Sequence, residues 1–177
     1  MKTLLYILGT FFIISSCSTT KESGLAGSER KDIDPAVKNA IEARRYIIKL
    51  DRLYSWGGVI NLKPRSNYII VDGEKAIISA AYMGRQYDIR PIAGISMRGV
   101  ARDYEVTSKL SKGKYEVKMK VGNESTDVFD VYLTISKDGS AGASVSGLRI
   151  ENISYRGYVV PLGNQVRVPL QEENGMI

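Results

Sequence analysis

The sequence predicts a mainly β domain, in which an antiparallel sheet folds into a sandwich or an open barrel, with one N-terminal helix. Two observations predict this fold class. Several segments alternate apolar and polar residues, as strands with one buried face do, and turn-forming residues separate them. By contrast, a clear helical spacing of apolar residues appears only near residue 37. We therefore expect about eight short strands with one helix closing one side.

The expected helix opens the domain. Asp34 is a suitable N-cap and Pro35 suits the first helical position. Apolar residues then follow at helical spacing: Val37, Ala40 and Ile41. We expect the helix to end near Arg45, because residues 46–50 favour a strand. A helix that continues to Leu53 is the alternative.

The strands are expected where alternation is regular. The expected segments are 66–71, 75–82, 114–121, 129–135, 141–150 and 153–160. Asp72-Gly73 is a strong hairpin signal, and residues 137–140 form the turn before the next strand. Apolar residues change parity around Gly147, which indicates a β-bulge there.

The N-terminus has the features of a bacterial export signal. Lys2 is followed by an apolar stretch, residues 4–14, that is too short to cross a bilayer as a helix. Ile14-Ser15-Ser16-Cys17 resembles a lipobox, which implies cleavage before Cys17 and attachment of acyl chains such as palmitate to that residue. The alternative is ordinary secretion with a chance cysteine.

The export signal and the lipobox predict the domain organisation. Residues 1–16 are the lipoprotein signal peptide, residues 17–33 are the lipidated cysteine and a flexible polar tether, and residues 34–177 form a single β-rich domain. Such a tether would reach roughly 20 Å from the membrane. Because Ser18 follows the cysteine, we expect the outer membrane, with the domain facing the periplasm or the cell surface.

The available side chains limit the chemistry. The chain has no histidine and a single cysteine, so histidine-dependent triads and common zinc sites are excluded. No phosphate-binding loop or dinucleotide motif occurs, so we expect no cofactor, no metal and no enzymatic activity. The alternative is a carboxylate-dependent hydrolase of glycan or peptidoglycan, which would need two carboxyl groups about 5–10 Å apart in a cleft.

The expected partner lies in the cell envelope. The formal charge of +6 is moderately basic and suits an anionic surface, although a solvated mixed-charge surface is the simpler interpretation. Envelope glycan, lipopolysaccharide or an envelope protein are therefore the expected classes of partner, in addition to the membrane itself. Nucleic acid is not expected for an exported, anchored protein.

The best candidate binding residues are aromatic and basic. Residues 82–90 follow a strand and combine flat faces with forked donors, and Gly84 would let the backbone approach a ligand. The candidates are Tyr82, Arg85, Tyr87 and Arg90, with Trp56 in a second turn. The structural alternative is that Tyr82 is a core residue at the strand end and that Arg85 pairs with a carboxylate.

Four elements resemble a known family. They are Asn67-Tyr68 before Asp72-Gly73, Ala81-Tyr82-Met83-Gly84-Arg85 with Tyr87, Gly113-Lys114-Tyr115, and Ile153-Ser154-Tyr155-Arg156-Gly157. Together they resemble the envelope lipoproteins grouped as domain of unknown function 4251, over about residues 40–162. The resemblance implies a β-rich envelope domain and carries no catalytic residue.

Overall fold

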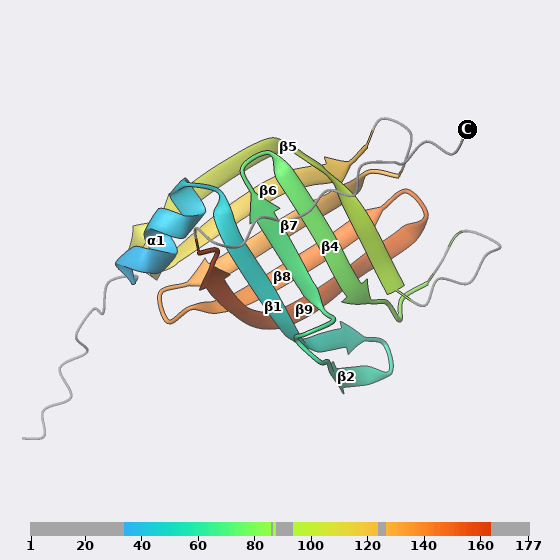
Figure 1. Cartoon of the computed structure of the whole chain (residues 1–177). Helices are drawn as coiled ribbons and strands as arrows, with labels where there is room; N and C mark the ends of the chain where they lie inside the picture. Colours follow the sequence, from blue (N-terminus) through green and yellow to red (C-terminus); the bar gives the residue numbers. More distant parts are fainter. Residues whose placement is uncertain (1–33, 86, 88–93, 124–126, 164–177) are drawn as a thin grey trace, which may run out of the picture. The chain divides into compact units, whose positions relative to one another are not determined.

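The computed structural model describes residues 34–85, 87, 94–123 and 127–163, which form a β-barrel with a helix at one end (Figure 1). The helix α1 spans Pro35–Glu42 and a short 3-10 helix spans Leu110–Lys112. The strands found in the described residues are β1 (Arg45–Ser55), β2 (Gly58–Asn61), β3 (Tyr68–Asp72), β4 (Lys75–Ala81), β5 (Gly94–Lys109), β6 (Lys114–Gly122), β7 (Phe129–Ser136), β8 (Ser140–Gly147) and β9 (Ile150–Pro161). The expected mainly β class with an N-terminal helix is confirmed.

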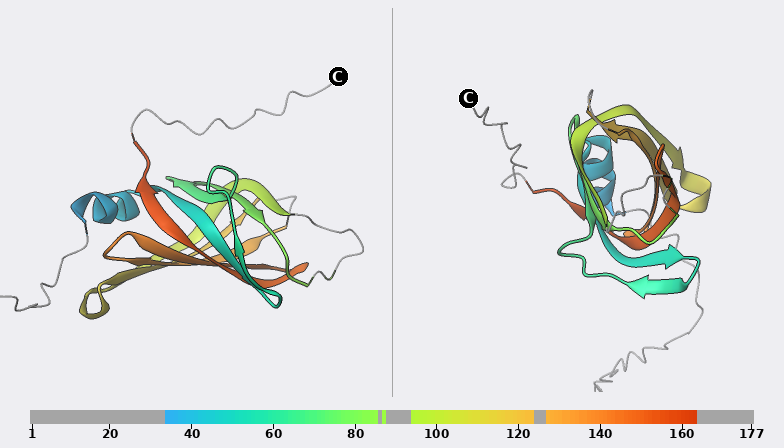
Figure 2. Two further views of the ribbon diagram at one scale, coloured as in Figure 1. Left: turned by 90° about the horizontal axis from the view of Figure 1, so that it is seen from below. Right: turned by 90° about the vertical axis from the view of Figure 1, so that its right-hand side faces the viewer.

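The sheet closes on itself. Neighbouring strands are antiparallel in the order β1-β3-β4-β5-β6-β7-β8-β9, and β9 then pairs with β1. The expected sandwich or open barrel was therefore wrong, because eight strands form a closed ring (Figure 2, right). β1 pairs with β3 through Arg45–Lys49 and with β9 between Tyr46 and Tyr54, so the ring closes without a free edge between β1 and β9. Strand β2 lies outside the ring and forms a hairpin with the end of β1.

Apolar side chains fill the barrel. In β6 the expected alternation is confirmed, because the four apolar side chains are buried: Tyr115, Val117, Met119 and Val121. The largest fully buried side chains come from all around the ring and include Tyr46, Leu50, Ile78, Leu133 and Tyr155. The interior is thus a packed core, and polar side chains of the same strands lie on the outer face.

The helix begins as expected and ends earlier. The Asp34 carboxylate accepts a hydrogen bond from the backbone N–H of Ala36 at 2.9 Å, and Pro35 opens the helix. The expected end near Arg45 was wrong, because Arg44 adopts a φ of 53°. A left-handed residue at this position stops helical hydrogen bonding, so β1 begins at Arg45.

The strand boundaries also differ in part from the expectation. β3 runs from Tyr68 to Asp72, rather than over residues 66–71, and β9 begins at Ile150. Strands β2 and β5 were not expected, although β5 has sixteen residues. The register of β8 against β9 shifts between Val145 and Gly147, which confirms the expected bulge.

Candidate functional site

The barrel end opposite α1 is closed by the chain that follows β4. Two backbone hydrogen bonds attach this chain to the β8–β9 turn, Tyr87 N to Arg149 O at 2.9 Å and Glu151 N to Arg85 O at 3.1 Å. In the ring, β3 and β1 lie between β4 and β9, so this segment crosses the opening. We call this part of the barrel the loop end and the α1 side the helix end.

Tyr82 holds the crossing segment in place. Its side chain is buried, and its hydroxyl donates to the carbonyl oxygen of Arg85 and accepts from the backbone N–H of Glu151 at 3.0 Å. Burial raises the pKa of Tyr82, while the hydrogen bond from the backbone of Glu151 opposes that shift. The structure thus places Tyr82 in the structural role that was the alternative to ligand binding.

Gly84 is required by this packing. A Cβ atom at Gly84 would lie 2.5 Å from the hydroxyl oxygen of Tyr82, so a side chain there would displace the ring. The φ of Gly84 does not lie in the left-handed region. Among the described glycines, those with a left-handed φ are Gly58, Gly73, Gly113 and Gly139. The glycine therefore makes room for Tyr82, which is a different reason from the close approach to a ligand that the sequence suggested.

Two predicted residues meet at the surface of the loop end. Trp56 lies in the turn between β1 and β2 and is 82% exposed. The guanidinium carbon of Arg85 lies 5.3 Å from the centre of the Trp56 ring. This geometry is a cation–π contact, and the exposed ring surface remains available to a partner.

Further large side chains are exposed in the crossing segment and in the β8–β9 turn. Tyr87 is 69% exposed and Leu148, in the β8–β9 turn, is 87% exposed. Met83 is also exposed. Arg90, the remaining predicted residue, lies outside the described residues. A cluster of exposed large apolar side chains on one end of a domain is typical of a binding surface.

A small hollow adjoins Trp56 and contains residues that sequence reasoning missed. Its volume is about 260 Å³, and its lining includes Tyr54, Glu151, Asn152 and Ser154. One carboxylate oxygen of Glu151, Oε2, is buried without a hydrogen-bond partner in the described structure. Tyr54, two residues before Trp56 in the sequence, was the available signal for this hollow.

Neither a metal centre nor a membrane-crossing helix is found in the described part of the chain. Among these residues, acidic and cysteine side chains do not gather in groups of three or more that could hold a metal ion. Their helices are too short and too polar to cross a membrane. The chemistry of the loop end is therefore built from aromatic faces, guanidinium groups and carboxylates.

The comparison with family models identifies the relatives of this barrel. The model for the domain of unknown function DUF4251 matches residues 29–159. The chain belongs to this family. Its membership confirms the resemblance carried by the tyrosine and glycine motifs, of which the one around Tyr82 and Gly84 lies at the loop end. The family has no assigned activity.

A solved structure supports the same fold. A DUF4251 family protein from Bacteroides eggerthii superposes with a TM-score of 0.59 at 14% sequence identity, covering 71% of this chain and 85% of that one. At this identity the likeness concerns the fold. The comparison with curated proteins gave no match.

Proposed function

We propose that this DUF4251 protein is an outer-membrane lipoprotein, anchored through Cys17, whose barrel is a non-enzymatic binding module for a cell-envelope component. The observation that carries the proposal is the exposed Trp56 ring with the Arg85 guanidinium beside it. Trp and Arg are the residues most enriched at binding hot spots. An exposed tryptophan on a loop end that hydrogen bonds already fix is well suited to recognition, since little ordering is required on binding.

The position of the loop end supports this proposal. The helix α1, with which the described chain begins, lies at the helix end, and the hairpin of β1 and β2, whose turn contains Trp56, lies at the other end of the barrel (Figure 1). If residues 17–33 are the membrane tether, the domain is held from its helix end. The tether would then join the domain at a different end from the one that carries Trp56.

The packed interior also favours a surface role. Large side chains such as Tyr46, Leu133 and Tyr155 fill the described interior, so a ligand would bind outside the barrel. This differs from barrels that enclose a small molecule. The partner is therefore expected to be extended or large, such as a glycan or an envelope protein.

One observation favours the alternative hydrolase. Three carboxylates, from Asp103, Glu105 and Asp130, line a hollow of about 540 Å³ on the outer face of the barrel. However, the Asp103 side chain is 67% exposed and its carboxylate lies 3.3 Å from the amino group of Lys120. A general acid of this kind sits in a buried apolar site, and Asp103 is instead exposed and paired with a lysine. Binding therefore remains the leading proposal.

Anchoring is tested by fractionation of cells that express the full chain. Wild-type protein should be recovered with the outer membrane on a density gradient. The Cys17→Ala protein should be absent from the outer-membrane fraction, because the thiol is the acceptor of the lipid. Cys17→Ala protein that distributes with the outer membrane as the wild type does would refute lipid anchoring. Wild-type protein with inner-membrane markers would refute the location.

Binding is tested by chemical crosslinking in the envelope, followed by purification of the tagged full chain. The double variant Trp56→Ala/Arg85→Ala should lose most of the crosslinked species and keep its melting temperature. The matched control is Tyr158→Ala, because Tyr158 is an exposed aromatic residue on β9, away from the loop end. Equal crosslinking of the double variant and the control would refute the proposed surface.

A further inference from the structure

Three adjacent hollows lie in a row on the outer face of the barrel. The hollow of about 540 Å³ and a second of about 340 Å³ share Tyr132 and Ser144 in their linings. The second shares Tyr54 and Ser154 with the hollow beside Trp56. We call this row of hollows, from β5 across β6, β7, β8 and β9 to β1, the outer groove.

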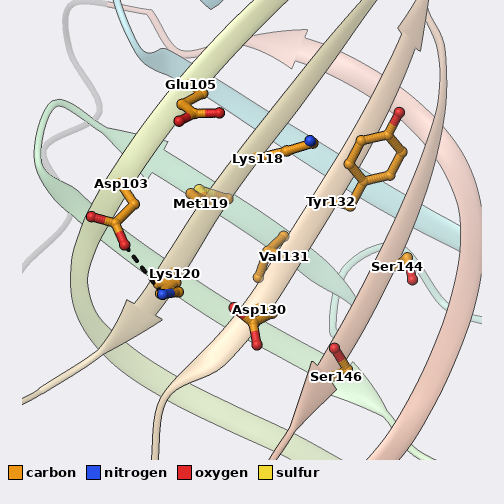
Figure 3. Close-up of a pocket in the computed structure, with 10 residues that line it drawn as sticks. All are labelled: Asp103, Glu105, Lys118, Met119, Lys120, Asp130, Val131, Tyr132, Ser144 and Ser146. Carbon is orange, nitrogen blue, oxygen red and sulfur yellow. Dashed lines mark ion pairs between the residues drawn. The ribbon is translucent and has the colours of Figure 1, made fainter.

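Strand register places the key side chains in one row across the groove. Lys118 is opposite Tyr132, Tyr132 is opposite Ser144, Ser144 is opposite Ser154, and Ser154 is opposite Tyr54. Tyr132 and Tyr54 are therefore three strand intervals apart, roughly 14 Å. Figure 3 shows Tyr132, Lys118 and Ser144 on adjacent strands of this face. Small side chains lie between two aromatic walls.

The Tyr132 wall adjoins an ion cluster. The Glu116 carboxylate contacts the amino groups of Lys109 at 2.6 Å and Lys114 at 2.9 Å. These two ion pairs, with a smaller effect of the nearby Tyr132 hydroxyl, lower the pKa of Glu116 to about 2. A charged cluster therefore lies beside the Tyr132 wall.

The Tyr54 wall is restrained by a cation. The guanidinium carbon of Arg156 lies 5.9 Å from the centre of the Tyr54 ring. Trp56 continues the aromatic surface beyond Tyr54, with Arg85 beside it. The groove thus presents three aromatic side chains in succession, and at least two of these have a cation as a neighbour.

The floor and rim supply polar groups of both signs. Ser144 and Ser154 offer hydroxyls in the floor, and the Ser144 hydroxyl already hydrogen bonds to Asn152. The charged lining residues are three cations, Lys118, Lys120 and Arg156, and four anions, Asp103, Glu105, Asp130 and Glu151. This near balance provides little attraction for a polyanion and many hydrogen-bonding groups for an uncharged ligand.

We propose that the outer groove binds a glycan strand of uncharged hexose or N-acetylhexosamine units. A sugar ring offers a face of C–H groups to an aromatic side chain and hydroxyls around its rim to polar groups. Tyr132, Tyr54 and Trp56 supply the aromatic faces, and the serines and charged side chains supply hydrogen bonds. This inference rests on the proposed binding function and names the ligand class.

Trp56 provides the measurement. It is the only tryptophan of the chain and borders the groove, so its fluorescence reports on occupancy of the Trp56 end. The full chain, purified in detergent, is titrated with chitohexaose and with cellohexaose, which separate N-acetylhexosamine from hexose recognition. Calorimetry follows the same titrations independently of Trp56. Saturable binding of one hexasaccharide, at least tenfold tighter than its disaccharide, is expected because the tyrosines are far apart.

Variants locate the binding. Tyr132→Ala and Tyr54→Ala should each weaken hexasaccharide binding about tenfold or more and leave the melting temperature close to that of the wild type. The matched control is Tyr158→Ala, an exposed aromatic residue outside the groove linings, which should bind as the wild type does. Binding that neither groove variant weakens, or calorimetry with no heat at millimolar sugar, would overturn the inference.

Two further arms separate this inference from the proposed function. If crosslinking of envelope components depends on Trp56 and Arg85 but neither hexasaccharide binds, the binding function stands and the glycan inference fails. Heparin that binds more tightly than both sugars would also overturn it, because the groove would then favour anions. Chromatography of the bound sugar for shorter products tests hydrolysis, and cleavage would support the glycan ligand while refuting a non-enzymatic module.

Discussion

The two ends of the barrel are closed by different means. At the helix end, α1 buries its apolar side chains Val37, Ala40 and Ile41 against the core. At the loop end, one tyrosine and a few backbone hydrogen bonds hold a crossing segment, and the large side chains around it stay exposed. An end closed by side-chain packing has few apolar groups left for a partner. An end closed by hydrogen bonds can keep them on its surface.

The helix end also contains a buried polar network. The hydroxyl groups of Tyr46 and Tyr104 lie 3.0 Å apart, and Tyr104 donates to the carbonyl oxygen of Ile41 at 3.3 Å. The guanidinium carbon of Arg44 lies 4.4 Å from the centre of the Tyr104 ring. Burial raises the pKa of Tyr46 well above its usual value. These contacts attach α1 to β1 and β5, so this end is built for stability.

The largest effect on stability is expected from a substitution at the helix end. Ile41→Ala removes a fully buried side chain and leaves a cavity between α1 and the barrel, so it should lower the free energy of unfolding by about 2–5 kcal/mol. Urea denaturation of the full chain measures this change. A loss below about 1 kcal/mol would contradict the view that packing of α1 closes this end.

An intermediate effect is expected from the residue that holds the loop end. Tyr82→Phe keeps the ring but removes the hydroxyl that bonds to Arg85 O and Glu151 N, so it should cost about 1–3 kcal/mol. The control is Tyr87→Phe, because Tyr87 is exposed and should change stability by less than about 0.5 kcal/mol. Equal effects of the two variants would mean that Tyr82 does not fasten the segment.

A smaller, pH-dependent effect is expected from the ion cluster on β5 and β6. The pKa of Glu116 is lowered from 4.5 to about 2 in the folded state, so the unfolded state binds more protons between these values. The contribution of Glu116 to stability is therefore complete above pH 4.5 and is lost as the pH falls towards 2. Thermal melting across this window should show a shallower acid dependence for Glu116→Gln than for the wild type. Identical slopes would exclude a contribution from this cluster.

The smallest effect on stability is expected from Trp56. Because the ring is exposed and its known contact is with one cation, Trp56→Ala should change the free energy of unfolding by less than about 1 kcal/mol. Urea denaturation followed by circular dichroism measures this, since the variant has no tryptophan fluorescence. A larger loss would place Trp56 among the residues that close the barrel and would weaken the contrast between the two ends.

The sequence by itself determined the local features of this protein. The mainly β class follows from the alternation in β6 and β7, the helix start from Asp34-Pro35, and the β3–β4 hairpin from Asp72-Gly73, where Gly73 has a φ of 64°. The family follows from short tyrosine and glycine motifs. Each of these depends on neighbouring residues, whose preferences are readable without knowledge of the rest of the chain.

Strand β5 shows where local patterns fail. Its inward residues Ile95, Met97 and Ala101 share one parity, and the register against β6 then shifts between Arg102 and Glu105, where Asp103 has a φ of 51°. The shift moves the next inward residue, Tyr104, to the other parity, so no single alternation runs through the strand.

Only the tertiary structure decided the closed barrel and its binding surfaces. Closure depends on β1 pairing with β9, more than one hundred residues later in the chain. The same pairing brings Tyr54 into a row with Tyr132, and the crossing segment brings Arg85 to Trp56. Such contacts depend on which strands are neighbours and in which register. The free energy of packing the whole barrel determines the strand neighbours and their register, and this free energy cannot be inferred from any short stretch of sequence.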